Sequence, residues 1–356
     1  RCVGADDLTL SLFENQYPVQ PMGVSYNSYL ILDEKIAVMD SVDARAADEW
    51  LAKLAHELDG RSPDYLVISH MEPDHSGSIL RLAEKYQEMK LVGNTKTFTM
   101  LRQFFGAKAP TDDRLLEVGE GETLPLGAHT LHFMLAPMVH WPEVMVAYEE
   151  TEKLLFSADA FGRFGALSRT AGAPWAPQAR RYYYNIVGKY GAQVQALLKK
   201  ASALEIKTVC PLHGPVLTGE ALGEALRLYD LWSRWQSESP DDILLAHASI
   251  HGNTARAAEL LKQKLEAKGA RVTLCDLTTT EVSYAVANAF YCGKLVLACS
   301  TYDGGLFPPM EEFLSHLQAK GFRDRSVGLM ENGSWAPAAA RLMRAKLEEM
   351  KDLRVC

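Results

Sequence analysis

Ser69-His-Met-Glu-Pro-Asp-His-Ser-Gly77 is the stretch of this sequence that says most about its fold and chemistry. It overlaps the end of the apolar run 65–70, which predicts a short strand. It also holds four side chains that could bind metal within six residues: His70, Glu72, Asp74 and His75. A strand end is rigid and the loop after it can wrap around an ion, so this spacing favours a metal site. A lone histidine after an apolar run is more often structural, but four possible ligands at this density are hard to explain that way.

Three more side chains that could bind metal follow later predicted strands. His140 comes after the run 131–138, Asp159 after 154–157 and His213 after 208–212. Each alone could equally be structural. In order, His-x-Glu-x-Asp-His followed by His, Asp and His resembles the metallo-β-lactamase superfamily. That resemblance implies an αββα sandwich with a two-metal site built from loops at one edge.

One position departs from the hydrolases of that superfamily. They usually carry a second histidine where this sequence has Glu72. A carboxylate is a harder ligand than an imidazole, so this replacement suits iron or manganese. Zinc, in contrast, accepts a nitrogen-rich ligand shell. Carboxylate-rich pairs of iron are typical of oxygen and redox chemistry. We therefore expect two iron ions, with Asp159 as the best candidate to bridge them.

Length and composition limit the other possibilities. The chain has 356 residues, 47% hydrophobic and 23% charged, which predicts a globular protein of about two domains. Residues 241–356 hold 14 acidic and 14 basic side chains, so the whole net charge of −8 lies in residues 1–240, where bound cations could offset part of it. This balance argues against nucleic-acid binding. No stretch could span a membrane, and the six cysteines form no C-x-x-C pair, so we expect a cytoplasmic protein without a disulfide framework or a fused rubredoxin-type module.

Residues 1–240 mix predicted strands with predicted helices. Two pairs of β-rich runs predict hairpins, and three segments show helical periodicity. Such a mixture supports an α/β sandwich with helices on its outer faces, and we assign residues 1–240 to it. The predicted hairpins are 26–32 with 36–40 and 144–148 with 154–157, and the predicted helices are 46–58, 77–89 and 95–105.

Residues 241–356 alternate strictly between predicted strands and helices, which implies a doubly wound parallel sheet. The boundary is expected within 237–242, where Ser-Glu-Ser-Pro-Asp-Asp breaks the preceding helix. Such a sheet usually closes with a fifth strand, and the chain stops at Cys356, where that strand would begin, so we expect it to be incomplete. The predicted strands are 243–249, 271–276, 294–300 and 326–330, and the predicted helices are 254–268, 281–290, 309–320 and 336–350.

Three polar loops follow the first, third and fourth of these strands. In a sheet of order 2-1-3-4-5 they meet at the switch point, where a mononucleotide binds. The first loop opens a helix whose N-terminal N–H groups can hold a phosphate, while Tyr302 and Trp335 offer aromatic faces for a flavin ring. The arrangement resembles flavodoxin, which implies FMN. The expected FMN-binding residues are Ser249, Ile250, His251, Gly252, Asn253, Thr254, Ser300, Thr301, Tyr302, Asp303, Gly304, Gly305, Asn332, Gly333, Ser334 and Trp335.

Together the two halves resemble the flavodiiron proteins, or A-type flavoproteins, over nearly the whole chain. The resemblance implies a diiron centre that reduces dioxygen to water, nitric oxide to nitrous oxide, or both, with electrons arriving through FMN from rubredoxin or a reductase. Three features depart from the family pattern: His251 stands where an aromatic residue is common, the third flavin loop is not a close match, and 160–167 lacks a histidine that many members carry. The resemblance implies one iron on His70, Glu72 and His140, the other on Asp74, His75 and His213, and Asp159 as the bridge.

The strand geometry of the second part argues for a dimer. The linker enters the strand 243–249 at its start, whereas FMN would lie beyond its end, about 23 Å away at ~3.3 Å per residue. Electron transfer within one chain would therefore be poor. The family resemblance implies a head-to-tail homodimer, or a dimer of dimers, with the FMN of one chain beside the irons of its partner. Trp141 could lie at that junction or be a core aromatic.

Two other functions remain open. A dinuclear zinc hydrolase with an accessory flavodoxin domain is the main alternative, and Glu72 argues against it. A pure electron shuttle would need an empty metal site, although all seven ligand positions hold competent residues. Cys210 lies three residues before His213 but has no second feature of a nucleophile. We expect the remaining histidines to be structural: His56, His129, His132, His247 and His316.

Overall fold

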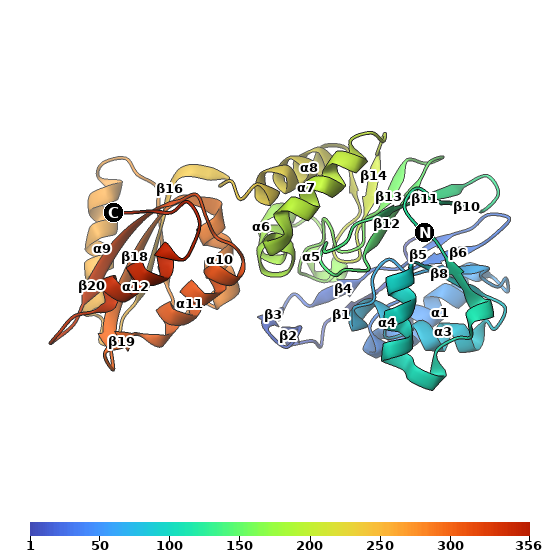
Figure 1. Ribbon diagram of the computed structural model, residues 1–356, viewed down its shortest axis with the longest axis horizontal. Helices are drawn as coiled ribbons and strands as arrows, with labels where there is room; N and C mark the ends of the chain where they lie inside the picture. Colours follow the sequence, from blue (N-terminus) through green and yellow to red (C-terminus); the bar gives the residue numbers. More distant parts are fainter. The chain divides into compact units, whose positions relative to one another are not determined.

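The computed structural model describes all residues, 1–356, and divides into two compact units (Figure 1). The first unit comprises residues 1–182 and 192–229. The second comprises residues 183–191 and 230–356. The predicted domain limits, 1–240 and 241–356, remain a prediction about how the chain folds. No helix combines the length and the apolar character needed to cross a bilayer. The six cysteines are unpaired.

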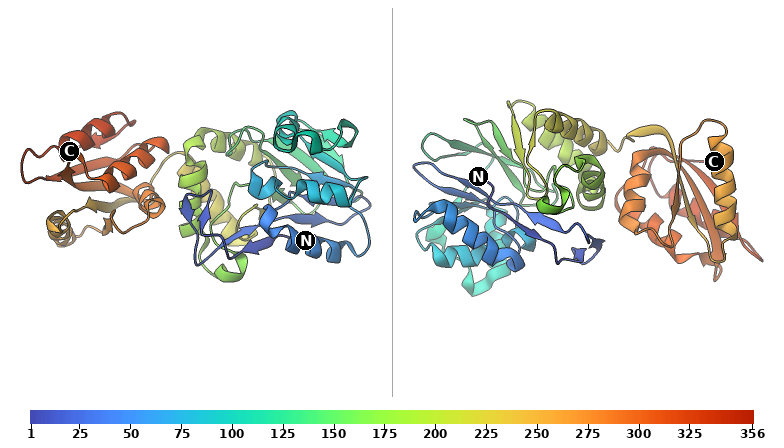
Figure 2. Two further views of the ribbon diagram at one scale, coloured as in Figure 1. Left: turned by 90° about the horizontal axis from the view of Figure 1, so that it is seen from below. Right: turned by 180° about the vertical axis from the view of Figure 1, so that it is seen from behind.

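Two sheets packed face to face form the first unit (Figures 1 and 2). Side chains alternate along the strands: Leu131 and Phe133 are buried in the shared core, whereas His132 between them is half-buried. Met39 and Val67 of the opposite sheet join the same core. The five-stranded sheet has the order β5 (Tyr29–Ile31), β6 (Ala37–Met39), β7 (Tyr65–Val67), β8 (Lys90–Gly93) and β9 (Leu115–Glu117), and the six-stranded sheet has the order β10 (Thr123–Pro125), β11 (Thr130–Leu135), β12 (Met145–Glu149), β13 (Leu154–Phe156), β14 (Thr208–Cys210) and β15 (Leu217–Thr218).

Helices cover both outer faces of this pair of sheets, which confirms the predicted αββα sandwich (Figure 1). Two short antiparallel pairs precede the sandwich in sequence, β1 (Ala5–Asp7) with β4 (Val24–Tyr26) and β2 (Leu12–Phe13) with β3 (Tyr17–Pro18). The helices beside the first sheet are α1 (Ala47–Leu58), α3 (Ile79–Lys85) and α4 (Thr95–Phe105), and those beside the second are α6 (Trp175–Tyr182), α7 (Gly191–Ala201) and α8 (Gly219–Ser233).

Two of the predicted elements are shorter in the structure. The helix expected over 77–89 is only Ile79–Lys85, because Arg114 donates to the carbonyls of Ala83, Tyr86 and Met89 and holds the chain after Lys85 in a loop. The strand expected to reach residue 138 ends at Leu135, since Pro137 has no N–H to continue the ladder.

The second unit is a five-stranded parallel sheet flanked by helices (Figures 1 and 2). Its order, β17-β16-β18-β20-β21, is the predicted 2-1-3-4-5 order, and the flavodoxin-like fold is confirmed. The fifth strand is present as Arg354–Val355, paired in parallel with β20. The strands are β16 (Ser239–Ala248), β17 (Val272–Asp276), β18 (Cys292–Tyr302), β20 (Ser326–Asn332) and β21 (Arg354–Val355), with β19 (Gly305–Leu306) paired to the end of β18, and the helices are α9 (Asn253–Glu266), α10 (Val282–Tyr291), α11 (Pro308–Ala319) and α12 (Ala339–Glu348).

Local sequence explains two boundaries in this unit that differ from the prediction. Strand β16 begins at Ser239 rather than Ile243, and its register with β18 shifts between these residues because Pro240 lacks an N–H. Helix α12 begins at Ala339 rather than at residue 336, after Pro337. The hydroxyl of Thr301 accepts hydrogen bonds from the N–H groups of Ala338 and Ala339 and so fixes the start of this helix.

Candidate metal centre and flavin site

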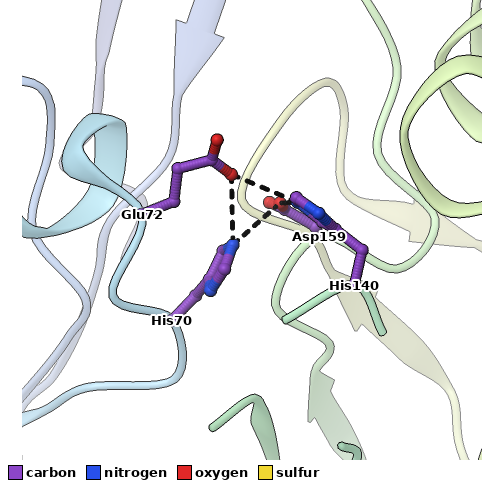
Figure 3. A group of neighbouring side chains, drawn as sticks. All are labelled: His70, Glu72, His140 and Asp159. Carbon is purple, nitrogen blue, oxygen red and sulfur yellow. Dashed lines mark hydrogen bonds and ion pairs between the residues drawn. The ribbon is translucent and has the colours of Figure 1, made fainter. Parts of the chain in front are cut away.

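The seven metal-ligand residues converge at one edge of the first unit, in two groups whose nitrogen and oxygen atoms lie within 4.8 Å of one another inside each group. They come from four segments, which follow β7, β11, β13 and β14 of the two sheets. The first group is His70, Glu72, His140 and Asp159 (Figure 3), and the second is Asp74, His75 and His213.

The first group surrounds a small space between two histidines and two carboxylates (Figure 3). The Oε2 atom of Glu72 lies 3.2 Å from Nε2 of His70 and 3.1 Å from Nε2 of His140. The Oδ2 atom of Asp159 lies 3.0 Å from Nε2 of His140 and 3.5 Å from Nε2 of His70. Four donor atoms therefore face one point, as they would around a metal ion.

Asp159 also faces the second group with its other oxygen. Its Oδ1 atom lies 3.2 Å from Nε2 of His75 and 3.6 Å from Nε2 of His213. The Oδ2 atom of Asp74 lies 3.4 Å from Nε2 of His75 and 3.2 Å from that of His213. One carboxylate thus presents one oxygen to each group, which is the geometry that a bridging ligand needs.

Two of the histidines are oriented by hydrogen bonds on their far side. Nδ1 of His70 lies 2.8 Å from Oε1 of Glu143, and Nδ1 of His213 lies 2.7 Å from the carbonyl oxygen of Ser25. Because both partners are acceptors, each Nδ1 carries the proton and each Nε2 presents its lone pair to the centre. This tautomer is the one that a metal ion requires.

The buried polar atoms of the centre need cations. Both carboxylate oxygens of Asp74 and Oδ1 of Asp159 are buried without a hydrogen-bond partner. Nε2 of His75 also lies 3.1 Å from Nε2 of His213, which presents a lone pair. Orphaned carboxylate oxygens and opposed imidazole nitrogens are costly in a buried site unless a cation lies between them. The donor set therefore fits two metal ions.

A further carboxylate, Asp40, supports the loop that carries His70. Asp40 follows β6 directly and has a positive φ of 56°, and its Oδ1 atom accepts hydrogen bonds from the N–H groups of Ser69 and His70. Burial raises the pKa of its carboxyl group, against the opposing influence of His75 and these hydrogen bonds. Its contacts are with backbone, so it positions the loop rather than adding a ligand.

A cavity of about 560 Å³ opens beside Glu72 and Asp74. The β2–β3 hairpin provides part of its wall, including Phe13 and Glu14, and Tyr26 provides another part. The sequence contains no motif that would place this hairpin at the centre. The cavity gives a small molecule a route to the ligand groups.

Four residues at or near this centre were not found from the sequence. Glu143 and Ser25 hold histidines, Asp40 holds a loop, and the hydroxyl of Tyr182 is buried without a hydrogen-bond partner. Burial, with Asp159, Asp74 and Glu72 nearby, raises the pKa of Tyr182 well above its usual range. Only Glu143 had a local signal, since it follows His140 by three residues.

The residues expected to be structural lie outside the centre. His129 pairs with Asp33 at 2.8 Å and His132 with Glu150 at 2.9 Å. Cys210 is a buried strand residue, and burial raises the pKa of its thiol to about 12.

Trp141 is half-buried and packs edge-on against His70, with ring centroids 5.3 Å apart. The last contact places Trp141 at the metal centre within this chain.

The metal-free centre is expected to lose stability as the pH rises from 6.5 to 9. Burial lowers the pKa of His140, but the hydrogen bonds that its protonated ring donates to Asp159 and Glu72 outweigh burial and raise the pKa to about 9. A pKa that is higher in the folded than in the unfolded chain stabilises the fold below pH 6.5, and that stability, about 3 kcal/mol, is lost as the pH passes 9. Thermal unfolding of metal-free protein at pH 6.5 and 9 measures this. Metal-loaded protein is the control and should show no such loss, because metal replaces the proton; a loss of equal size there would contradict the assignment.

The predicted FMN-binding residues are all brought to the carboxyl-terminal ends of β16, β18 and β20. Residues 249–252 connect β16 to α9, which begins with Asn253 and Thr254. Residues 300–302 end β18, 303–304 form the turn after it and Gly305 begins β19. Asn332 ends β20, and 333–335 follow it. The Oγ1 atom of Thr254 lies 2.8 Å from Oγ of Ser300, and the side-chain amide of Asn332 donates to it at 3.3 Å. The three loops therefore meet at one place.

These loops leave groups available to a ligand. The hydroxyl oxygen of Ser249 is buried without a hydrogen-bond partner. Gly252 and Gly304 have φ of 84° and 73°, and a side chain there would meet no atom within 4 Å. Tyr302 is 44% exposed and Trp335 is 83% exposed. So large an exposed fraction is unusual for a tryptophan side chain. The hydroxyl of Ser249 and the N–H groups at the start of α9 could bind an anion. The exposed rings of Tyr302 and Trp335 could pack against an aromatic ring.

Comparisons with known proteins find similarity over both units of the chain. A family model described as the ODP family beta lactamase matches residues 24–214. The chain is 28% identical to the rubredoxin-oxygen oxidoreductase of Megalodesulfovibrio gigas, over 98% of this chain and 87% of that protein. It is 27% identical to the nitric oxide reductase of Moorella thermoacetica, over 98% and 88%. The crystal structure of the flavodiiron protein from Giardia intestinalis superposes with a TM-score of 0.90 at 26% identity, covering 99% of this chain and 89% of that one.

The fold and the site define a two-metal protein in which a β-lactamase-like unit is followed by a flavodoxin-like unit. The predicted resemblance is confirmed over both units. The chain belongs to the ODP family of β-lactamase-fold proteins and is a flavodiiron protein.

Proposed function

We propose that this protein is an oxidoreductase that reduces dioxygen to water, nitric oxide to nitrous oxide, or both, with FMN and two iron ions as cofactors, in defence against oxidative or nitrosative stress. The relatives named as a rubredoxin-oxygen oxidoreductase and a nitric oxide reductase support this reaction class. The observation that carries the proposal is Asp159, whose two oxygens face two separate ligand groups. We propose His70, Glu72 and His140 as the ligands of one iron, and Asp74, His75 and His213 as those of the other.

The chain's own residues prepare the centre for this chemistry. When bound, the iron pair and FMN would supply the electrons and the open coordination position that reduction of a diatomic molecule requires. The hydrogen bonds that His70 donates to Glu143 and His213 donates to Ser25 fix these two ligand histidines in the metal-binding tautomer. The cavity beside Glu72 and Asp74 admits the substrate, and Phe13, which lines the cavity, packs edge-on against His213.

The zinc hydrolase remains the second candidate, since its fold is the same. The carboxylate of Glu72 within the first ligand group favours iron over zinc. Metal analysis of the protein as purified separates the two, because two zinc ions together with hydrolysis of a thioester or lactam would support the hydrolase.

We also propose a head-to-tail dimer, which would bring the FMN of one chain to the metal centre of its partner. Each unit exposes apolar side chains near its own site. Leu12, on the rim of the cavity, is 38% exposed, and Ile250, Tyr302 and Trp335 are exposed around the flavin loops. An electron donor of the rubredoxin type is proposed from the name of the relative in M. gigas, and a cytoplasmic location remains a prediction from the cysteine pattern.

Anaerobic stopped-flow spectroscopy tests the function. Iron-loaded protein with reduced FMN is mixed with dioxygen and, separately, with nitric oxide. We expect flavin reoxidation with at least one of them, about 100-fold or more faster than in metal-free protein carrying reduced FMN. If neither gas reoxidises the flavin faster than in that control, the function is wrong. Repeating the measurement at dilutions that give monomers tests the dimer, since monomers should lose the fast phase.

A further inference from the structure

The two ligand groups differ in what lies behind their histidines. In the first group, His70 donates from Nδ1 to a carboxylate, Oε1 of Glu143, at 2.8 Å. In the second group, His213 donates from Nδ1 to a neutral carbonyl, that of Ser25. Nδ1 of His75 is buried and has no hydrogen-bond partner. Only the first group therefore has a carboxylate behind a ligand.

Glu143 is held in one position by its surroundings. The side chain is buried, with 1% of the residue's surface exposed. Its Oε1 atom accepts a second hydrogen bond, from the N–H of Met71 at 2.8 Å, and its own carbonyl accepts one from the side-chain amide of Asn94. Its other oxygen, Oε2, is buried without a partner. His70 is therefore the one metal-ligand side chain to which Glu143 is hydrogen-bonded.

The other buried carboxylates do not cancel this difference. Glu72 serves the first group, Asp74 the second, and Asp159 gives one oxygen to each. Asp40 accepts hydrogen bonds from backbone N–H groups and none from a ligand side chain, so it lacks the direct imidazole contact that Glu143 makes, although its carboxyl also acts electrostatically on His75 of the second group. The ligand carboxylates are thus shared evenly, and Glu143 adds one negative charge on the side of the first group.

We propose that Glu143 makes the two metal positions unequal, so that the position formed by His70, Glu72 and His140 binds a divalent ion more tightly than the position formed by Asp74, His75 and His213. A carboxylate that accepts the Nδ1 proton makes the imidazole a stronger donor at Nε2, and its charge attracts the cation. The same charge favours the more oxidised state of the iron held there. Glu143 is a positioning residue, and this inference rests on the proposed two-metal function.

Calorimetric titration with Co²⁺ tests the inference on full-length, FMN-containing protein stripped of metal. The wild-type protein should bind two equivalents in two steps. His140→Ala should remove the tighter step, and His213→Ala the weaker one. Glu143→Gln keeps an acceptor oxygen for His70 and Met71 and places its NH₂ where Oε2 has no partner, so it removes the charge without removing the hydrogen bonds. We expect it to weaken the tighter step by about 10- to 100-fold and to leave the weaker step within about threefold.

Glu149→Gln is the matched control. Glu149 is equally buried, in β12, but its carboxylate accepts from the N–H groups of Thr151 and Glu152 and contacts no ligand. It should leave both steps unchanged. Equal weakening of both steps by Glu143→Gln, or no weakening, would overturn the inference. The inference would also be overturned if His213→Ala removed the tighter of the two Co²⁺-binding steps. That result does not depend on how well the Glu143 variant folds. Binding of fewer than two equivalents by the wild-type protein would overturn the proposed two-metal function itself.

Discussion

Replacing Asp159 with asparagine is expected to remove two-metal binding and to lower the rate of substrate reduction by at least about 100-fold. Both oxygens of Asp159 face ligand nitrogens, Oδ2 towards His140 at 3.0 Å and Oδ1 towards His75 at 3.2 Å. Asparagine has one oxygen and no charge, so it can serve one group at most. Its NH₂ would also face the other group with a donor in place of a ligand. Metal analysis after dialysis and stopped-flow reoxidation of FMN measure the two effects.

The control for this variant is Asp33→Asn. Asp33 also lies 2.8 Å from a histidine, His129, but that pair is remote from the centre. The control should keep two metal ions per chain and change the rate by less than about threefold. If Asp159→Asn retained two tightly bound ions and a rate within tenfold of wild type, Asp159 would not be the bridge.

Replacing Arg325 with methionine is expected to lower the free energy of unfolding of the second unit by about 3 kcal/mol or more. Arg325 is 4% exposed, and all five of its hydrogen bonds go to backbone carbonyls. They join Trp235, before the first strand of the sheet, to Phe290 and Cys292, where α10 meets β18. Methionine fills part of the space but leaves these acceptors without a donor. Urea unfolding followed by FMN fluorescence measures the effect, and the midpoint of FMN release should fall.

Arg323→Met is the matched control in the same segment. Arg323 is half-buried and lies over the ring of Trp235 at 3.8 Å, with one hydrogen bond, to the carbonyl of Gly321. It should cost within about 1 kcal/mol. Equal effects of the two variants would show that the five hydrogen bonds of Arg325 do not stabilise this segment.

Much of the fold was predictable because its signals are local. Strict alternation of strands and helices after residue 241 predicted a parallel sheet, and its order is the predicted one. The exceptions have non-local causes. Arg114 takes carbonyls at the end of α3 from about 30 positions away, so the periodicity of 77–89 could not show where the helix ends. The expectation of an incomplete fifth strand stays a prediction, since the two residues that form it, Arg354 and Val355, pair with β20 at the end of the chain.

The sequence by itself determined which residue types could bind metal and in what order they occur. His70, Glu72, Asp74 and His75 lie within six residues after a strand, and a pattern that short can be read without the fold. The tertiary structure alone decided how these residues are supported. Glu143 meets His70 across 73 positions and Ser25 meets His213 across 188, and no spacing rule predicts such pairs. They exist because the two packed sheets bring the ends of distant strands to one edge, where each buried imidazole must find an acceptor for its second nitrogen.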